Sequence, residues 1–197
     1  MILLACAVED ELALWKPRED VSALVTGVGP VEASAAIATA LAHRPYRLVV
    51  NAGIAGAFDG AAAIGDGVVV ADDRMELALE SGAPLALPRG STLVDSAHSD
   101  PRLVALLAEK GFAALRGVTV SRVTSTDATA RRLARDGAQV ESMEGFAALR
   151  AAARAGVAAI EVRGISNRCG DREKSGWNFA AGISGLQRLL AALFELV

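Results

Sequence analysis

Carboxylates occur in two segments that could form an active site. One is the segment 8–11 (VEDE), directly after the apolar segment 2–7, and the other is the segment 141–145 (ESMEG), before an alanine-rich stretch. A carboxylate at the end of a strand can act as a general base, and an ionised carboxylate can accept hydrogen bonds from two vicinal sugar hydroxyls. Each carboxylate could instead cap a helix, because acidic residues are stabilised near the positive end of the helix dipole.

Segments rich in glycine or in hydrogen-bond donors also follow apolar runs. The segment 26–30 (TGVGP) indicates a turn whose backbone N–H groups could approach an anion or a hydroxyl. The segment 51–57 (NAGIAGA) could form a tight turn with close packing or contact a ligand. Glu32 stands where a dinucleotide-binding fingerprint needs its third glycine, which disfavours a nicotinamide site. The segment 161–167 (EVRGISN) ends in hydrogen-bond donors, and Trp177 beyond it could stack on a heterocycle or simply pack.

The histidines and cysteines form no pattern typical of a metal site or a catalytic triad. His43 stands alone at a predicted helix end and His98 in a predicted loop, which disfavours metal catalysis and a Ser-His-Asp triad. Cys6 and Cys169 are too far apart for a CxxC pair, and two cysteines are too few for a disulfide framework. We therefore expect no metal, and a location in the reducing cytoplasm.

The composition predicts a single folded domain, residues 1–197, that acts on a small molecule. Of the 197 residues, 52% are hydrophobic, which excludes a natively unfolded chain. The net charge of -3 argues against a nucleic-acid surface built on positive charge. Gly, Asp or Arg interrupts every apolar run before it reaches the roughly 20 residues of a membrane helix, so we expect no membrane partner.

Short apolar runs alternate with alanine-rich stretches, as in an α/β layered domain whose sheet is covered on both faces. The predicted strands are 2–7, 23–26, 48–52, 66–71, 118–123, 139–141 and 158–162. The predicted helices are 10–15, 30–42, 100–110, 127–135, 144–155 and 185–196. Pro30 suits the first position of a helix, and residues 74–96 are predicted to form a loop within the domain.

The order of five segments along the chain resembles the nucleoside phosphorylase and nucleosidase superfamily. The segments are 8–11, 26–30, 51–56, 141–147 and 163–167 with Trp177, and they span almost the whole chain. The resemblance implies a three-layer αβα sandwich with a central mixed, partly barrel-like sheet. It also implies that water cleaves the N-glycosidic bond of a purine nucleoside, without a metal or an organic cofactor, in a protein that is commonly a homo-oligomer.

The resemblance also assigns roles to residues by their positions in these motifs. Glu11 matches the general base that activates the water, and Arg163 would help to position that water. Glu144 and the backbone of Met143 would hold the ribose hydroxyls. The residues expected at the purine and along the rest of the substrate are Ser166, Asn167, Gly53, Ile54 and Trp177.

The chemistry of the leaving base stays open at this point. Adenine-specific relatives carry Asp at the position of Asn167, where it acts as an acid toward N7. An amide cannot donate a proton outright, so either Asn167 only hydrogen-bonds the leaving base or a nearby group such as Asp171 supplies the proton. Because Asn167 can turn its NH₂ group toward O6 or N7, we expect a preference for 6-oxopurine over 6-aminopurine nucleosides.

Three other functions compete with this hydrolysis. A nucleosidase for methylthioadenosine or adenosylhomocysteine would share the fold. A phosphorylase needs a basic phosphate site, but the segment 26–30 holds no Arg or Lys and the segment 57–59 reads AFD, so hydrolysis is favoured. A non-catalytic nucleotide-binding module would use the carboxylates only as helix caps.

Overall fold

The computed structural model describes residues 1–79, 83, 85–171 and 176–197. In these residues, one mixed sheet contains eight strands. The strands are β1 (Ile2–Cys6), β2 (Val21–Val25), β3 (Leu48–Ala57), β4 (Gly67–Met75), β5 (Ser96–His98), β6 (Ala113–Thr119), β7 (Val140–Ser142) and β8 (Ala158–Arg168). The helices are a short 3-10 helix η1 (Glu9–Leu12) and the α-helices α1 (Pro30–His43), α2 (Pro101–Glu109), α3 (Asp127–Arg135), α4 (Gly145–Arg154) and α5 (Phe179–Phe194).

Part of the sheet closes into a small barrel. The strand order is β2-β1-β3-β7-β6-β4-β5, and β8 pairs with both β3 and β4. Strands β3, β7, β6, β4 and β8 therefore form a closed ring, and β1 and β2 extend the sheet beyond β3. Strand β8 is parallel to β3 but antiparallel to β4, so the sheet is mixed. The predicted fold class, a mixed and partly barrel-like sheet between helices, is confirmed.

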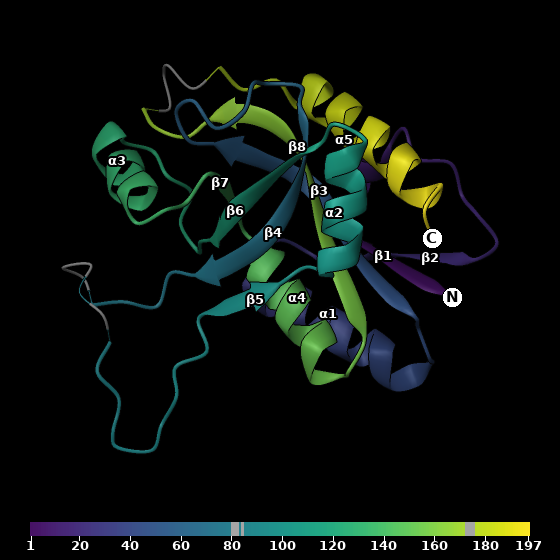
Figure 1. Ribbon diagram of the computed structural model, residues 1–197, viewed down its shortest axis with the longest axis horizontal. Coiled ribbons are helices and arrows are strands. Elements are labelled where there is room, and N and C mark those ends of the chain that lie inside the picture. Colours follow the sequence, from purple (N-terminus) through teal and green to yellow (C-terminus); the bar gives the residue numbers. More distant parts are fainter. Residues whose placement is uncertain (80–82, 84, 172–175) are drawn as a thin grey trace.

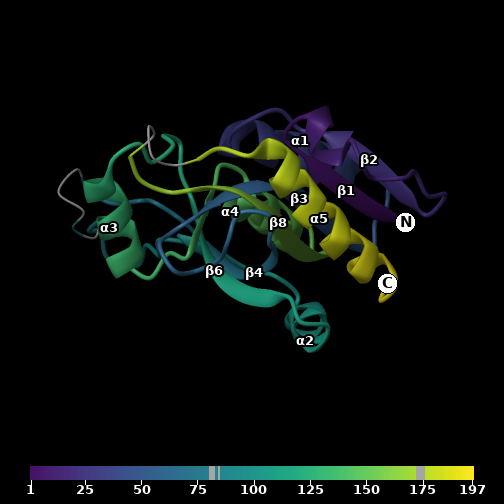
Figure 2. The ribbon, with the colours of Figure 1, turned by 90° about the horizontal axis from the view of Figure 1, so that it is seen from above.

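Two apolar clusters cover opposite faces of the sheet, because alternate residues of a strand face opposite sides. Leu4 of β1 packs in the cluster that contains Leu189 of α5, whereas Leu3 packs in the cluster that contains Ile37 of α1 and Leu149 of α4. In Figure 1, α5 crosses above the sheet, and α1 and α4 lie below it. Figure 2 shows α3 at the end of the molecule opposite to the two termini. Each such buried side chain contributes about 1.5–3 kcal/mol.

Two strands are longer than their apolar runs predict. Strand β3 continues past residue 52 to Ala57, and β8 continues past residue 162 to Arg168, in one parallel pairing. The predicted strands 48–52 and 158–162 therefore end too early, and residues 51–57 form no tight turn. The pairing continues because the closed ring buries this part of the sheet, so the polar side chains of β8 meet other buried polar groups instead of solvent.

The strands on the far side of the ring also differ from the prediction. Strand β6 shares only Val118 and Thr119 with the predicted strand 118–123. It begins at Ala113 in a sequence with few β-branched residues, where pairing with β4 outweighs weak local propensity. The segment 74–96 is not entirely a loop, because β4 runs to Met75 and β5 begins at Ser96. His98 therefore lies in a strand.

Two helices differ from the prediction, and the other four match it within one residue at each end. The predicted helix 10–15 is only the 3-10 turn η1, where the Glu11 carboxylate turns back to the N–H of Val8. Helix α5 begins at Phe179 instead of residue 185, because Asn178 caps it by accepting a hydrogen bond from the N–H of Ala181 at 3.0 Å. In the described residues, no helix has the length and apolar character needed to cross a membrane.

Candidate active site

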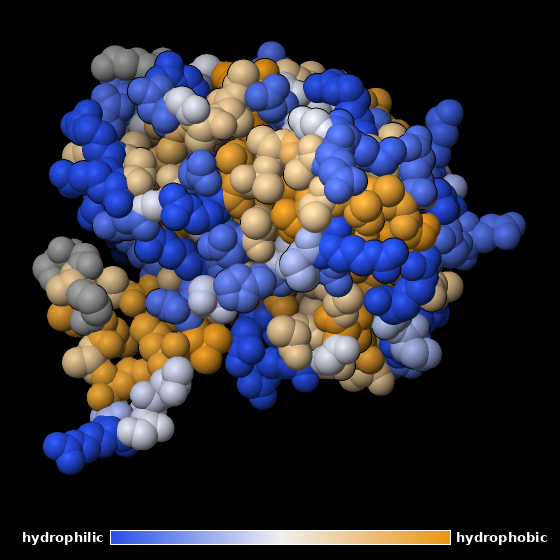
Figure 3. All heavy atoms as spheres, in the orientation of Figure 1, coloured by the Kyte–Doolittle hydropathy of each residue, from blue (hydrophilic) through white to orange (hydrophobic). Residues whose placement is uncertain are grey.

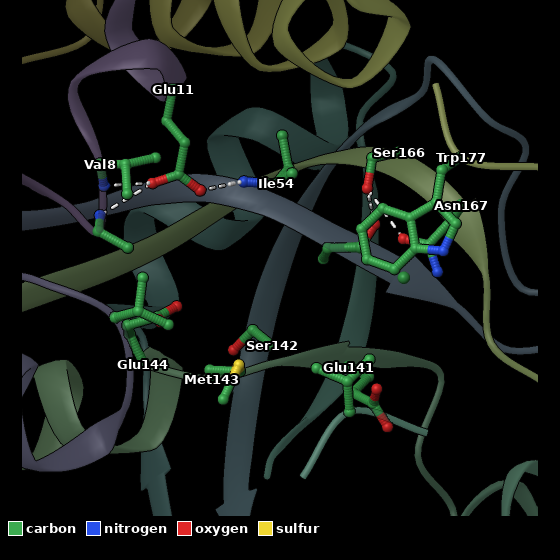
Figure 4. Close-up of a pocket in the computed structure, with 15 residues that line it drawn as sticks. Val8, Glu11, Ile54, Glu141, Ser142, Met143, Glu144, Ser166, Asn167 and Trp177 are labelled. Carbon is green, nitrogen blue, oxygen red and sulfur yellow. Dashed lines mark hydrogen bonds between the residues drawn. The ribbon is translucent and has the colours of Figure 1, made fainter. Parts of the chain in front are cut away.

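A cavity of about 200 Å³ lies beside the ends of β1 and β7 and the second halves of β3 and β8. The predicted site residues that line it are Glu11, Ile54, Met143, Glu144, Ser166, Asn167 and Trp177. Figure 4 shows two ends of this cavity. Glu11 and Glu144 form one end, called here the carboxylate end, and Ser166, Asn167 and Trp177 form the other, called the amide end.

Three backbone N–H groups fix the carboxylate of Glu11 in the wall of the cavity. Oε2 accepts from the N–H of Ala7 at 2.8 Å and of Val8 at 3.2 Å, and Oε1 accepts from the N–H of Ile54 at 2.9 Å. The bond with Val8 is a helix-capping contact, but the bond with Ile54 joins η1 to β3. Burial raises the pKa of Glu11 above its ordinary value, although Arg163 and the N–H groups oppose the rise. A higher pKa makes this carboxylate a better proton acceptor near neutral pH.

Arg163 lies behind the cavity lining, next to Gly53. Its guanidinium donates from Nε to Glu161 Oε1 at 2.8 Å, and its Nη1 lies 3.7 Å from Glu144 Oε2. A Cβ at residue 53 would stand 2.5 Å from Nη1 and 2.7 Å from Glu11 Oε1, so only glycine leaves room for these groups. Although burial lowers the pKa of Arg163, the charges of Glu161, Glu144 and Glu11 raise it above its ordinary value. Arg163 is therefore a cation among carboxylates.

The side chain of Glu144 binds the turn before α1 instead of capping α4. Its Oε1 accepts a hydrogen bond from the N–H of Gly29 at 3.0 Å, and its side chain makes no capping hydrogen bond to the first turn of α4. The glycine turn 26–30 therefore donates this N–H to a carboxylate of the chain itself. The helix-cap alternative does not apply to the Glu144 side chain, whose Oε2 lies on the side of Arg163.

Ser166 and Asn167 form a hydrogen-bonded pair at the amide end. The Ser166 hydroxyl donates to Asn167 Oδ1 at 2.9 Å, and Asn167 Nδ2 donates to the carbonyl of Arg168 at 3.2 Å. One proton of Nδ2 is bound to the carbonyl of Arg168, so the amide can offer the second Nδ2 proton to a ligand. A Cβ at residue 56 would lie 2.9 Å from Nδ2, so Gly56 leaves the space that the amide occupies.

Trp177 is held at the amide end by its neighbours in the chain. The N–H of Asn178 donates to the carbonyl of Ser166 at 2.7 Å, which ties this segment to β8. The indole packs on Phe179 with ring centroids 5.2 Å apart, and Figure 4 shows it beside Asn167. The arrangement brings an aromatic surface to the cavity, where a heterocycle could stack.

Glu141 also lines the cavity, although the sequence-based assignment named only Glu144 of the two carboxylates in this motif. The N–H of Thr124, at 2.9 Å, and its hydroxyl both donate to the Glu141 carboxylate. Glu141 and Asn167 pair with Gly56 from opposite sides, so both side chains face the same side of the sheet. Burial raises the pKa of Glu141 above its ordinary value, against these hydrogen bonds. The spacing of two carboxylates three residues apart was the signal for this residue.

Asp171, the alternative proton donor for the leaving base, is not among the residues that line the cavity. Its backbone N–H donates to Asp127 Oδ1 at 2.9 Å, which places this part of the chain against α3. Of the two groups considered for the leaving base, Asn167 is the one in the cavity wall.

Relatives and a family model match most of the chain. The model of the phosphorylase superfamily matches residues 13–195. The futalosine hydrolase of Thermus thermophilus is 35% identical over 178 residues, which cover 86% of this chain and 79% of that protein. The futalosine hydrolase of Acidothermus cellulolyticus is 40% identical over 181 residues, which cover 86% of this chain and 73% of that protein.

Solved structures share the fold at low sequence identity. Futalosine hydrolase of Helicobacter pylori superposes with a TM-score of 0.84 at 14% identity, covering 100% of this chain and 97% of that one. The 5'-methylthioadenosine/S-adenosylhomocysteine nucleosidase of Neisseria meningitidis, in complex with methylthio-immucillin-A, superposes with a TM-score of 0.81 at 15% identity. This superposition covers 100% of this chain and 99% of that one. These structures support the fold, and the relatives define the family. The chain belongs to the phosphorylase superfamily and, within it, to the futalosine hydrolase family.

Proposed function

We propose that this protein hydrolyses the N-glycosidic bond of futalosine and releases hypoxanthine and dehypoxanthine futalosine, a step of menaquinone biosynthesis. The relatives that are 34–40% identical to it are futalosine hydrolases. The observation in the molecule that carries the proposal is a single cavity with a buried carboxylate, Glu11, at one end and a hydrogen-bonding amide, Asn167, at the other.

The carboxylate end acts on the sugar in this proposal. Water attacks C1′ while the bond from C1′ to N9 breaks, and Glu11 takes a proton from this water. The carboxylates of Glu11 and Glu144 stabilise the positive charge that develops on the sugar. Glu144, with the backbone of Met143, also accepts hydrogen bonds from the ribose hydroxyls. Arg163 acts from behind Gly53, where its charge favours the ionised form of Glu11 and so orients the water through that carboxylate.

The amide end holds the purine in this proposal. Hypoxanthine presents two acceptors, O6 and N7, along one edge, and Nδ2 of Asn167 donates to that edge as negative charge develops on the base. Because an amide keeps its protons, the base leaves as an anion held by this hydrogen bond and then takes a proton from water. Ser166 fixes the orientation of the amide, Trp177 stacks on the purine, and the N–H of Ile54 keeps Glu11 in place.

Incubation of the pure protein with futalosine, followed by separation of the products, tests the proposal. We expect release of hypoxanthine in phosphate-free buffer, at a rate that added phosphate does not raise. A requirement for phosphate would identify a phosphorylase, and faster cleavage of methylthioadenosine or adenosylhomocysteine would identify an adenine nucleosidase. Binding of these nucleosides without cleavage of any of them would identify a non-catalytic module.

We also propose that the protein is a homo-oligomer of the cytoplasm. The excursion between β4 and β5 exposes large apolar side chains, which are Leu77, Leu79, Leu85, Leu87 and Val94. Figure 3 shows this excursion as a mainly apolar surface at the lower left of the molecule, and exposed apolar surface of this kind is typical of an interface. Both cysteine thiols are free, as a reducing compartment favours. Light scattering should give a mass of at least two chains, and the mass of one chain would contradict the oligomer.

A further inference from the structure

A second pair of carboxyl groups, Asp73 on β4 and Glu161 on β8, lies behind the carboxylate end of the cavity. Their exposed fractions are 1% and 0%. A Cβ at residue 145 would stand 2.4 Å from Asp73 Oδ2, 2.4 Å from Glu161 Oε2 and 2.3 Å from Glu161 Oε1. Three carboxyl oxygens therefore share the space beneath the first residue of α4, and Gly145 is the residue that leaves this space open.

The hydrogen-bond donors around this pair leave one carboxyl oxygen unsatisfied. Thr119 Oγ1 accepts from the N–H of Phe146 at 2.7 Å, and its hydroxyl donates to Asp73 Oδ1 at 2.9 Å. Arg163 Nε donates to Glu161 Oε1 at 2.8 Å. Within the part of the chain that the structure describes, Glu161 Oε2 has no hydrogen-bond partner. A proton on Asp73 Oδ2 supplies the missing donor, because this oxygen and Glu161 Oε2 both lie 2.4 Å from the position of a Cβ at residue 145.

The charges of the cluster favour the same proton. Asp73, Glu161, Glu144 and Glu11 are buried around the guanidinium of Arg163, which is the one buried cation among the described residues. Four ionised carboxylates at buried positions around one cation would be strongly unfavourable, because a buried charge is stabilised only when it is paired. Arg163 favours the ionised form of Glu161, its direct partner. Burial, and then the charge of Glu161, raise the pKa of Asp73 well above its ordinary value, so Asp73 carries the proton.

We propose that Asp73 and Glu161 form an acid–carboxylate pair that shares one proton and positions Arg163 for the reaction. Glu161 holds Nε and Ser142 Oγ accepts from Nη2 at 3.3 Å, which leaves Nη1 directed toward Glu144. Both residues of the pair are positioning residues, since they act on the substrate only through the guanidinium. The inference rests on the proposed function, and it adds that two residues outside the cavity control the charge of Glu11, the proposed general base.

The shared proton can be tested without substrate. A protonated carboxyl group has a C=O stretch separate from the carboxylate bands, so infrared spectra of the folded wild-type protein at pH 7 should contain an acid band that Asp73→Asn removes. Asn keeps a donor toward Glu161, so the variant should fold. A wild-type spectrum at pH 7 without an acid band, or a band that survives in Asp73→Asn, would overturn the shared proton.

Chemical denaturation at two pH values gives a second test of the proton on Asp73. Because the folded-state pKa is raised, the wild-type protein loses stability as the pH rises from the ordinary pKa of Asp through the folded-state pKa. Asn does not ionise. The free energy of unfolding of Asp73→Asn, minus that of wild type, should therefore be larger at pH 8 than at pH 4. A smaller difference at pH 8 would contradict the proposal.

Glu161→Gln tests the positioning of Arg163. Gln keeps the size of Glu161 but loses its charge, so the positive charge of Arg163 acts more strongly on Glu11 and lowers the pKa of Glu11. The acid limb of the profile of kcat/KM against pH should then move to lower pH. The kcat should also fall on the order of 10- to 100-fold, as for a misplaced group in an active site.

Ser99→Ala is the matched control. Ser99 Oγ accepts from the backbone N–H of Glu161 at 3.0 Å and donates to the carbonyl of Val70 at 2.6 Å, so its loss disturbs the same point of β8 without touching the carboxylate. It should lower the melting temperature but leave the acid limb in place. An unmoved limb in Glu161→Gln, or an equal movement in Ser99→Ala, would overturn the positioning role. If the wild-type protein fails to cleave futalosine while the acid band is present, the proposed function fails and the shared proton remains.

Discussion

The two ends of the cavity are held in place by different parts of the chain. At the carboxylate end, Glu11 and Glu144 accept hydrogen bonds from backbone N–H groups of β3, of the residues that follow β1, and of the turn before α1. At the amide end, Asn167 is held by its neighbours in sequence, Ser166 and Arg168. The carboxylates therefore depend on donors from distant segments, whereas the hydrogen bonds of the Asn167 amide come from residues next to it in the sequence.

Because of this difference, we expect the carboxylate end to determine the rate of hydrolysis and the amide end to determine which purine is preferred. Substitutions at the carboxylate end should act mainly on turnover, because the fold fixes those groups relative to the sugar. Substitutions at the amide end should act mainly on affinity and on the preference among purines, because its side chains can change without altering the backbone of the barrel. Each variant below changes one end of the cavity, and its effects on kcat and KM are compared with those of variants at the other end.

Glu11→Gln should have the largest effect. Gln has almost the same size but cannot take a proton from water, so kcat for futalosine should fall by about 10²-fold or more, as for a lost general base. Steady-state kinetics measure the loss, and circular dichroism and the melting temperature check that the variant is folded. Turnover close to that of the wild-type protein would remove Glu11 from the mechanism.

Glu144→Ala should have an intermediate effect on both binding and turnover. The ribose hydroxyls lose a charged acceptor worth about 1.5–3 kcal/mol, which corresponds to roughly a 10- to 150-fold fall in kcat/KM. A 2′-deoxy substrate should lose less, because it has one hydroxyl fewer to donate. Equal losses for the ribose and deoxyribose substrates would contradict the assignment of Glu144 to the hydroxyls.

Trp177→Ala should have the smallest effect, and it should appear in KM. Aromatic stacking contributes about 0.5–1.5 kcal/mol beyond burial, so KM should rise up to about tenfold while kcat changes little. Trp177→Phe keeps an aromatic ring and serves as the control, with a KM between those of the other two proteins. A loss confined to kcat would show that the amide end takes part in the reaction as strongly as the carboxylate end.

The sequence predicted the elements whose signals are local. Pro30 after Gly29 marked the start of α1, and continuous apolar runs marked β1 and the first halves of β3 and β8. Strand β6 was misplaced because its pairing with β4, and not its own composition, determines where it begins. The second halves of β3 and β8 were missed because their polar and glycine residues resemble a loop until the closed ring buries them.

The resemblance predicted the residues of the candidate site, but it did not predict the residues behind the cavity that hold them in place. The motifs named Glu11 and Asn167, and both residues line the same cavity. Gly53 was assigned to the substrate by resemblance, and the structure adds that a side chain at this position would meet Arg163 and Glu11. The contact of Asp73 with Glu161 joins strands that are far apart in the sequence, so no local spacing could indicate it.

The central claim is that the carboxylate end hydrolyses the bond and the amide end selects hypoxanthine. The most direct test of this claim is to measure kcat/KM for three substrates on two proteins. The substrates are futalosine, its 6-amino analogue and methylthioadenosine, and the proteins are wild type and Asn167→Asp. An ionised Asp would face the O6 acceptor of hypoxanthine, whereas Nδ2 of Asn donates to it. Wild type should prefer futalosine, and Asn167→Asp should shift the ratio toward the 6-aminopurines by roughly 5- to 150-fold, for a discrimination of about 1–3 kcal/mol. A wild-type preference for methylthioadenosine, or a ratio that Asn167→Asp leaves unchanged, would contradict it.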